Sequence, residues 1–405
     1  MSRRWRLVPR ARPNLGGRQL AAALTVDEGQ RRDRDHVVDR LSAWTGHDTV
    51  SLAASGRGAL WALLATSKRR RAVIPAFTCN AVADAAELAG LRVEIVDVSD
   101  GYNWAPQDLV DLGPDDVVVA THQYGIPARI DQIAARVKAA GSLLIEDCAG
   151  GLGGRYRGRP LGSFGDAAFF SFDMSKLIHV PPKGGALTVA EPEWGSRARE
   201  WISASTAPIT SHSKAAHLAR AAFLAACGPA VYRGLHTAVL SSRGLATTEN
   251  GDPTLRPDAF YLARPAEWQA RIAAPQLDRI GPLAEAARRL YERYLEGLAG
   301  CESLKLPPHD AAWEWAPIRF PVLVHGDKLD YYRRLLDHGV DCAFSFTHLA
   351  AHPLPSRAQE IADSVLCLPF YPGLAAGDAE RVIEAVHAVD GAWQGVSMCK
   401  EALRR

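Results

Sequence analysis

The sequence lacks most of the features that assign a chain to a specialised class at once. Its 47 lysines and arginines are balanced by 45 aspartates and glutamates, so the net charge of +2 gives no overall field that favours nucleic acid. The seven cysteines include no CxxC pair, and their odd number fits reduced thiols in a cytoplasm. No internal repeat is present, and no apolar stretch of the signal-peptide type follows Met1. We therefore expect a cytoplasmic globular protein without nucleic acid or a metal ion.

What the chain does contain is enough apolar sequence for a large core. Hydrophobic residues make up 47% of the 405 residues, which suits two domains, or one large domain with a smaller one appended. We expect a basic N-terminal arm over 1–35, a large α/β domain over 36–260 and a small α+β domain over 261–405. Residues 1–33 are expected to be irregular, and a frayed, solvated tail is the alternative for the arm. Its arginines are Arg3, Arg4, Arg6, Arg10 and Arg12.

Strands and helices alternate through the first half of the chain. Short apolar runs predict strands, and the amphipathic stretches between them predict helices. Such alternation with short connections predicts a mostly parallel sheet covered by helices on both faces. The expected strands are a run ending at Ser55 and 72–74, 92–96, 117–120, 143–145, 167–171 and 186–189. The expected helices are 36–44, one opened by 56–58, 80–89 and 130–140.

The pattern changes after Trp201. Residues 215–240 are rich in alanine and leucine and are broken at Gly228, so they predict a helical hairpin within an insertion over about 205–245. Each half is too short to span a bilayer, and the hairpin could cover an active site, a dimer partner or a membrane surface. A kinked helix is expected over 268–298. It leads to a β-α-β-α remainder with strands at 316–324 and 365–368 and helices at 328–338 and 379–389.

Polar residues collect where the predicted strands end. Ser55, His122, Asp147 and Ser171 all lie at or just past such ends. In parallel sheets, ligands bind beyond the carboxyl ends of the strands. After Ser55, the segment Gly56-Arg57-Gly58 can offer a phosphate the free N–H groups and the positive dipole end of a helix.

The stretch 143–176 carries the chemistry most directly. It offers a carboxylate at Asp147, a hydroxyl at Ser171 and an amino group at Lys176. These groups suit pyridoxal phosphate, because a lysine can bind its aldehyde carbon as a Schiff base and a carboxylate can pair with its ring nitrogen. The hydroxyl can hold the phosphate. The lysine must be less basic than usual to act as nucleophile and proton carrier.

The order and spacing of many short motifs over about 50–389 resemble the DegT/StrS-type sugar aminotransferases. These are pyridoxal-phosphate enzymes of fold type I. The motifs are SGRGAL at 55–60, PAFTCNAV at 75–82, VDV at 96–98, HQYG at 122–125, IEDCAG at 145–150, GRPLGSFGDAAFFSF at 158–172, SK at 175–176, GGAL at 184–187, QLDRI at 276–280 and LCLPFYPGL at 366–374.

The resemblance implies roles for particular residues. It places the Schiff-base lysine on Lys176, the partner of the ring nitrogen on Asp147 and the phosphate hydroxyl on Ser171. It also implies a homodimer in which each active site is completed by the partner chain. The implied reaction moves an amino group from glutamate or glutamine to a keto-sugar, nucleotide-linked, or to a cyclitol ketone. The dehydratase branch of the family carries histidine at the lysine position, so the retained Lys176 argues for transamination.

Several positions depart from the family pattern. Arg57 stands where threonine is common, Cys79 where an aromatic ring stacks on the cofactor, and Gly150 where glutamine or histidine is common. Leu262 takes the place of the asparagine given to the partner's phosphate, although Arg264 is nearby. The altered contacts leave open a pyridoxal-phosphate enzyme of another type, such as elimination, aldol-type carbon–carbon chemistry or decarboxylation. A non-catalytic binding or regulatory protein of the same fold is a second alternative.

Three further residues are candidates for the substrate site. His122 and Tyr124 lie on the loop after a predicted strand, and a structural role is as compatible with their position. His348 lies in SFTHLAAH, where the small domain of the family faces the active site.

Overall fold

The computed structural model describes residues 6–27, 31–99, 101–109, 111–205, 207–208, 211–243, 263–310, 314–344 and 355–402. Its largest element is a seven-stranded sheet in the order β1-β9-β8-β5-β4-β2-β3. All strands run parallel except β9, which pairs antiparallel with both β1 and β8. The predicted strands are confirmed as β1 (Thr49–Ala53), β2 (Arg71–Pro75), β3 (Arg92–Val96), β4 (Asp116–Thr121), β5 (Leu143–Asp147), β8 (Ala167–Ser171) and β9 (Gly185–Val189).

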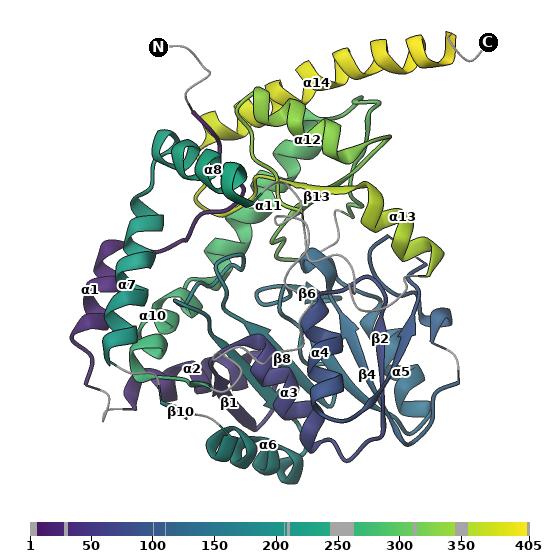
Figure 1. Cartoon of the computed structure of the whole chain (residues 1–405). Helices are drawn as coiled ribbons and strands as arrows, with labels where there is room; N and C mark the ends of the chain where they lie inside the picture. The colour runs from purple at the N-terminus through teal and green to yellow at the C-terminus, as the bar shows by residue number, and fades with distance from the viewer. Residues whose placement is uncertain are drawn as a thin grey trace.

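Helices cover both faces of this sheet (Figure 1). One face packs against α3 (Gly56–Thr66), α4 (Asn80–Leu88) and α6 (Pro192–Ser205). The other packs against α2 (Arg32–Thr45), α5 (Ile130–Ala139) and α10 (Glu267–Leu277). Within β4, Val117 and Val119 pack on the face covered by α3, α4 and α6, and Val118 and Ala120 pack on the opposite face. This alternation is what a strand imposes on its side chains, so the sheet is buried on both sides.

A second, antiparallel sheet lies toward the C-terminus. It consists of β12 (Leu304–Lys305), β13 (Phe320–Val324) and β14 (Val365–Leu368). Around it lie α11 (Ile280–Gly297), α12 (Lys328–Asp337), α13 (Ser356–Ser364) and α14 (Ala376–Ala402). Short elements complete the described chain: β6 (Arg155–Tyr156) pairs with β7 (Arg159–Pro160), β10 (Ala207–Pro208) with β11 (Ala263–Arg264), and two 3-10 turns span Pro106–Asp108 and Gln123–Gly125.

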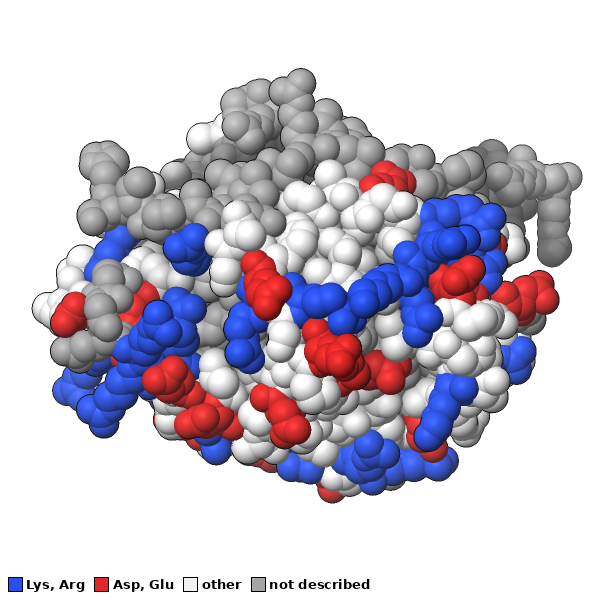
Figure 2. Space-filling view, turned by 90° about the horizontal axis from the view of Figure 1, so that it is seen from below, with Lys and Arg blue, Asp and Glu red and all other residues white. Residues whose placement is uncertain are grey.

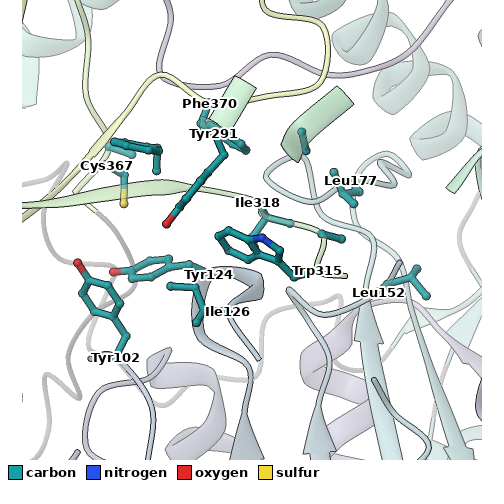
Figure 3. Packing of buried hydrophobic residues seen from close by; sticks show 14 of the residues in the cluster. Tyr102, Tyr124, Ile126, Leu152, Leu177, Tyr291, Trp315, Ile318, Cys367 and Phe370 are labelled. Carbon is teal, nitrogen blue, oxygen red and sulfur yellow. The ribbon is translucent and has the colours of Figure 1, made fainter. Parts of the chain in front are cut away.

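An aromatic cluster joins the second sheet to the first. The ring of Tyr291 packs edge-on against Trp315 at 4.5 Å and against Phe320 at 4.8 Å between ring centroids. Figure 3 shows the ring of Tyr291 above Tyr102 and Tyr124, which lie on the segments that follow β3 and β4 of the large sheet. The single helix predicted over 268–298 is in fact two, because the chain turns at residues 278–279 between α10 and α11.

The N-terminal segment is packed rather than solvated over its described residues. The helix α1 (Gly17–Leu24) lies against α10 and α7, with Leu20 buried. The prediction that residues 1–33 are irregular is therefore wrong over α1, whose apolar face is covered by two other helices. Upstream, Val8 is fully buried and Arg10 forms an ion pair of 2.7 Å with the buried carboxylate of Asp341.

Two helices form where the hairpin was predicted. They are α7 (Ser211–Ala226) and α8 (Pro229–Arg243), and the break falls at Cys227 and Gly228. The helices are confirmed, but they are not an antiparallel pair, because α7 runs beside α1 while α8 turns toward the N-terminal segment (Figure 1). The hydroxyl of Tyr232 on α8 donates to Asp341 at 2.6 Å, which ties α8 to the C-terminal part. Among the helices of the described ranges, none is long and apolar enough to cross a membrane.

Candidate active site

A cavity of about 130 Å³ opens at the carboxyl edge of the large sheet. It lies where the chain leaves β1, β5 and β8 and where it enters the reversed strand β9. Seven residues named from the sequence line it together: Ser55, Gly56, Arg57, Cys79, Asp147, Ser171 and Lys176. The carboxyl ends of parallel strands therefore bring distant parts of the chain to one site, as the sequence predicted.

Asp147 forms the acidic end of this cavity. Its Oδ1 accepts the N–H of Ala149 at 2.9 Å, and its Oδ2 accepts the hydroxyl of Thr121 at 3.2 Å. Burial raises the pKa of Asp147, while the Ala149 N–H and the positive charge of Lys176 oppose that rise. The carboxylate is thus fixed in orientation and suited to share a proton with a cationic ring nitrogen.

Lys176 follows the end of β8 by five residues, in a turn where its N–H donates to the carbonyl of Asp173 at 2.9 Å. Burial lowers the pKa of its amino group, the carboxylate of Asp147 raises it, and the guanidinium of Arg319 lowers it further. The net shift is downward, so Lys176 loses its proton more readily than an ordinary lysine. That is the property a nucleophilic lysine requires.

The N-terminus of α3 contributes the opposite side. Ser55 caps the helix by accepting the N–H of Gly58 at 3.0 Å, so this N–H is used within the helix rather than offered to a ligand. Gly56 and Arg57 line the cavity instead. A Cβ on Gly56 would lie 2.8 Å from the Cβ of Ser171, so only glycine lets the start of α3 approach the end of β8 this closely.

Three polar lining residues were not named as site candidates from the sequence: Asp173, Ser175 and Lys183. The Oγ of Ser175 is buried and has no hydrogen-bond partner within the described ranges. A buried hydroxyl left unpaired costs about 1–3 kcal/mol, so it indicates a place for a ligand group. Lys183 adds a second cation to that of Arg57. It precedes β9, and the sequence signal for it would have been the PPKGG turn, had the reversed direction of that strand been known.

These donors fit pyridoxal phosphate. Asp147 and Lys176 suit its ring nitrogen and its aldehyde carbon. The glycine-bearing start of α3, the hydroxyls of Ser171 and Ser175 and the nearby cations suit a dianionic phosphate.

The two departures in the centre of the site have different structural settings. Cys79 lines the cavity, and burial raises the pKa of its thiol, so a neutral sulfur stands where a stacking ring is common. Gly150 does not line the cavity, whereas the preceding Ala149 does. A Cβ on Gly150 would meet Ile318 at 3.0 Å and the backbone nitrogen of Gly125 at 3.1 Å. Glutamine or histidine there would require these neighbours to shift by a few tenths of an ångström.

His122 does not line the cavity but belongs to a buried network of hydrogen bonds. Its Nδ1 accepts the N–H of Ala128 at 3.1 Å, so its Nε2 carries the proton that faces Glu146 at 3.2 Å. Together with Cys148 these side chains have the spacing of a metal site. Both ring nitrogens are already engaged, however, and burial raises the pKa of the Cys148 thiol well above its usual value. This arrangement supports the loop that follows β5.

Tyr124 also lies away from the cavity. Its ring packs edge-on against Tyr102 at 5.1 Å, as Figure 3 shows, and its carbonyl accepts the N–H of Ile318 at 3.0 Å. Its backbone has a positive φ of 61°. The remaining candidates, His348 and Leu262, fall outside the described residues.

The chain is similar to known aminotransferases in sequence and in fold. The model of the family described as the DegT/DnrJ/EryC1/StrS aminotransferase family matches residues 35–387. A UDP-N-acetyl-3-dehydro-alpha-D-glucosamine 3-aminotransferase of Acidithiobacillus ferrooxidans is 25% identical over 328 residues, which cover 78% of this chain and 76% of that protein. A dTDP-3-amino-3,4,6-trideoxy-alpha-D-glucose transaminase of Micromonospora megalomicea is 26% identical over 320 residues, covering 74% and 73%.

A solved structure shares the fold. The aminotransferase TlmJ from Streptoalloteichus hindustanus aligns with a TM-score of 0.75 at 24% identity, covering 96% of this chain and 100% of that one. The predicted fold, a large mostly parallel sheet with helices on both faces, is confirmed.

Proposed function

Because the chain belongs to the DegT/DnrJ/EryC1/StrS aminotransferase family and uses pyridoxal phosphate, we propose that it transfers an amino group from an amino acid to a nucleotide-linked keto-sugar. The similar proteins named above carry UDP-linked and dTDP-linked sugars in their names, which supports this acceptor class. Glutamate or glutamine is the proposed donor, and a cyclitol ketone is the second acceptor class.

One observation carries the proposal: Asp147 and Lys176 line a single cavity together with the N-terminus of α3. When bound, the cofactor supplies an electron-withdrawing ring that makes the Cα–H of an amino acid acidic. Asp147 would hold a proton at the ring nitrogen, and Ser171, Ser175, Arg57 and Gly56 would hold the phosphate. The Nζ of Lys176, with its lowered pKa, can take a proton from Cα of the amino acid and deliver it to the aldehyde carbon of the cofactor.

The half-reaction with donor alone tests the proposal. The holoenzyme is incubated with glutamate, without any ketone, and 2-oxoglutarate is measured. Release of one equivalent per site supports transamination. Absence of release with every amino acid tried would favour elimination, aldol-type or decarboxylation chemistry. Failure of borohydride to trap the cofactor on Lys176 would favour a non-catalytic binding protein.

The acceptor is identified in a second step. The aminated enzyme is offered UDP-linked and dTDP-linked 3-keto-sugars, a cyclitol ketone and pyruvate, and return of the original cofactor absorbance is followed. Rapid return with a nucleotide-linked keto-sugar alone supports the proposed substrate class. A preference for pyruvate or for the cyclitol ketone would contradict it.

The assembly proposed for this function is a cytoplasmic homodimer with shared active sites. Its support is the family resemblance together with Arg264, which is exposed on β11 and follows the position where the family gives a phosphate ligand to its partner. The six cysteines whose side chains are described are all free thiols, which suits a reducing compartment. Light scattering after size-exclusion chromatography tests the dimer. Activity regained on mixing Lys176→Ala and Arg264→Ala variants tests the shared site.

A further inference from the structure

The large hydrophobic side chains that stand out into solvent in the described ranges lie on three helices, α1, α7 and α8. In the described ranges, those most exposed are Leu24 at 60%, Phe223 at 51%, Val231 at 51% and Leu235 at 41%. Leu24 belongs to α1, Phe223 to α7 and the other two to α8, and α1 packs beside α7 (Figure 1). Single exposed apolar residues are ordinary, but their concentration on adjoining helices marks a surface that meets something apolar.

The exposed residues of α7 and α8 follow helical spacing. On α7 the inward face holds Leu218 and Ala221, and on α8 it holds His236. Small and apolar residues form the outward stripe of each helix, with spacings of three and four positions. We call the two stripes together the α7–α8 face. It comprises Ala215, Ala219, Ala222, Phe223 and Ala226 on α7, and Ala230, Val231, Gly234, Leu235 and Ala238 on α8.

The charged residues of these two helices have one sign. From Trp201 to Thr248 the sequence contains neither aspartate nor glutamate, whereas Lys214, Arg220 and Arg233 lie on the two helices. The side of the molecule that Figure 2 shows is different, because blue and red side chains are interspersed across it. An apolar stripe flanked only by basic residues has the composition of helices that lie in the interface of an anionic bilayer.

We propose that the α7–α8 face binds the surface of a membrane rich in anionic lipid. A second copy of the chain suits the face less well, because in a contact of the face with itself the segment 201–248 offers no carboxylate to pair with Arg220 and Arg233. Anionic headgroups supply that opposite charge, while the shallow apolar stripe enters the region of the acyl chains. Binding is at the surface, since no helix of the described chain can span a bilayer.

Sedimentation with vesicles tests this proposal on the full-length holoenzyme. Vesicles of phosphatidylcholine containing about a third phosphatidylglycerol are compared with vesicles of phosphatidylcholine alone. We expect the protein to pellet with the first and not with the second, and to be released at high salt because exposed charges are then screened. Replacing Phe223, Val231 and Leu235 by serine should reduce the partition coefficient at least about tenfold, since each loses apolar contact with the bilayer.

Charge variants supply the matched comparison. Arg220→Gln with Arg233→Gln should weaken binding roughly fivefold per charge removed. Arg199→Gln, at an exposed position of α6, should leave it unchanged. All substituted side chains are exposed or half-buried, and thermal unfolding confirms that each variant is folded. The proposal is overturned if the wild-type protein does not bind anionic vesicles, or if it binds anionic and phosphatidylcholine vesicles equally. It is also overturned if the serine substitutions change only the oligomeric state, from dimer to monomer.

Discussion

The carboxylate of Asp147 and the amino group of Lys176 line the same cavity, and each charge partly offsets the pKa shift that burial causes in the other. Burial alone drives both groups toward their neutral forms. Their mutual attraction opposes the rise in the pKa of Asp147 without returning Lys176 to the basicity of a surface lysine. The attraction between the two charges therefore acts on the pKa at both ends of the cofactor site. Replacing either residue should change the titration of the other.

Replacing Lys176 by alanine should abolish the half-reaction and remove the attachment point of the cofactor. Lys183→Ala is the matched control, because Lys183 lines the same cavity but precedes β9. Borohydride treatment followed by mass spectrometry of peptides checks the outcome. The control should keep the label on Lys176 and bind the cofactor more weakly; a label on Lys183 in wild type would contradict the assigned roles.

Asp147→Asn should lower the pKa of Lys176 still further, because the negative charge that raises it is removed. The measurement is the rate at which the cofactor-free protein takes up pyridoxal phosphate, followed by absorbance as a function of pH. Uptake requires the neutral amine, so its midpoint should move to lower pH. The half-reaction itself should slow by roughly 100-fold or more, since the ring loses its acidic partner.

Arg319→Met should shift the same profile in the opposite direction. The guanidinium of Arg319 lowers the pKa of Lys176, so a neutral side chain of similar length should move the midpoint of uptake to higher pH. Arg319 is buried, and circular dichroism must show that the variant is folded. A midpoint unchanged in a folded variant would mean that Arg319 does not act on the lysine.

Gly56→Ala should weaken cofactor binding and lower stability by about 1–3 kcal/mol, because its Cβ would collide with Ser171. Gly281→Ala in α11 is the matched control: nothing lies within 4 Å of the added Cβ, and alanine favours a helix by about 0.5–1 kcal/mol. Denaturant unfolding and titration with pyridoxal phosphate separate the two effects. Equal affinity in both variants would remove Gly56 from the phosphate site.

Because of Asp341, the free energy of unfolding should fall at acidic pH. Burial acts to raise the pKa of this carboxyl, but contacts with His236, Arg10 and Tyr232 outweigh burial and lower it. The stabilisation is therefore present above the unfolded-state pKa of about 4 and is lost as pH falls through the lower folded-state value. Asp341→Asn should cost about 3–5 kcal/mol at neutral pH and flatten the acid limb in urea unfolding. An unchanged acid limb would contradict this assignment.

The sequence predicted which side chains lie together at places where reactive residues and strand ends coincide. Asp147 and Ser171 follow strands whose apolar pattern is unambiguous, and both line the cavity. Lys183 was missed because periodicity gives the position of a strand but not its direction, and β9 enters the site only because it is reversed. Gly58 was given a ligand role, but its N–H is taken by the helix cap on Ser55, a choice that local geometry decides.

Helices were less completely predicted than strands. The helices α6 and α13 were not expected, although Trp194, Ala198 and Ile202 of α6 have a four-residue spacing and are buried. The partners of α8 could not be predicted, because the bond from Tyr232 to Asp341 joins residues 109 positions apart. Such pairings depend on how distant elements pack, which a pattern along the chain does not record.

The cysteine in the cofactor cavity has a consequence for inhibitor design. A thiol beside a bound ligand is commonly targeted with an electrophilic inhibitor, since a thiolate reacts readily with electrophiles. Burial raises the pKa of Cys79, so at neutral pH it is held as the unreactive thiol. A covalent inhibitor of this enzyme should therefore be aimed at the amine of Lys176, whose pKa is shifted the other way, and Cys79 should survive treatment with reagents that label surface thiols.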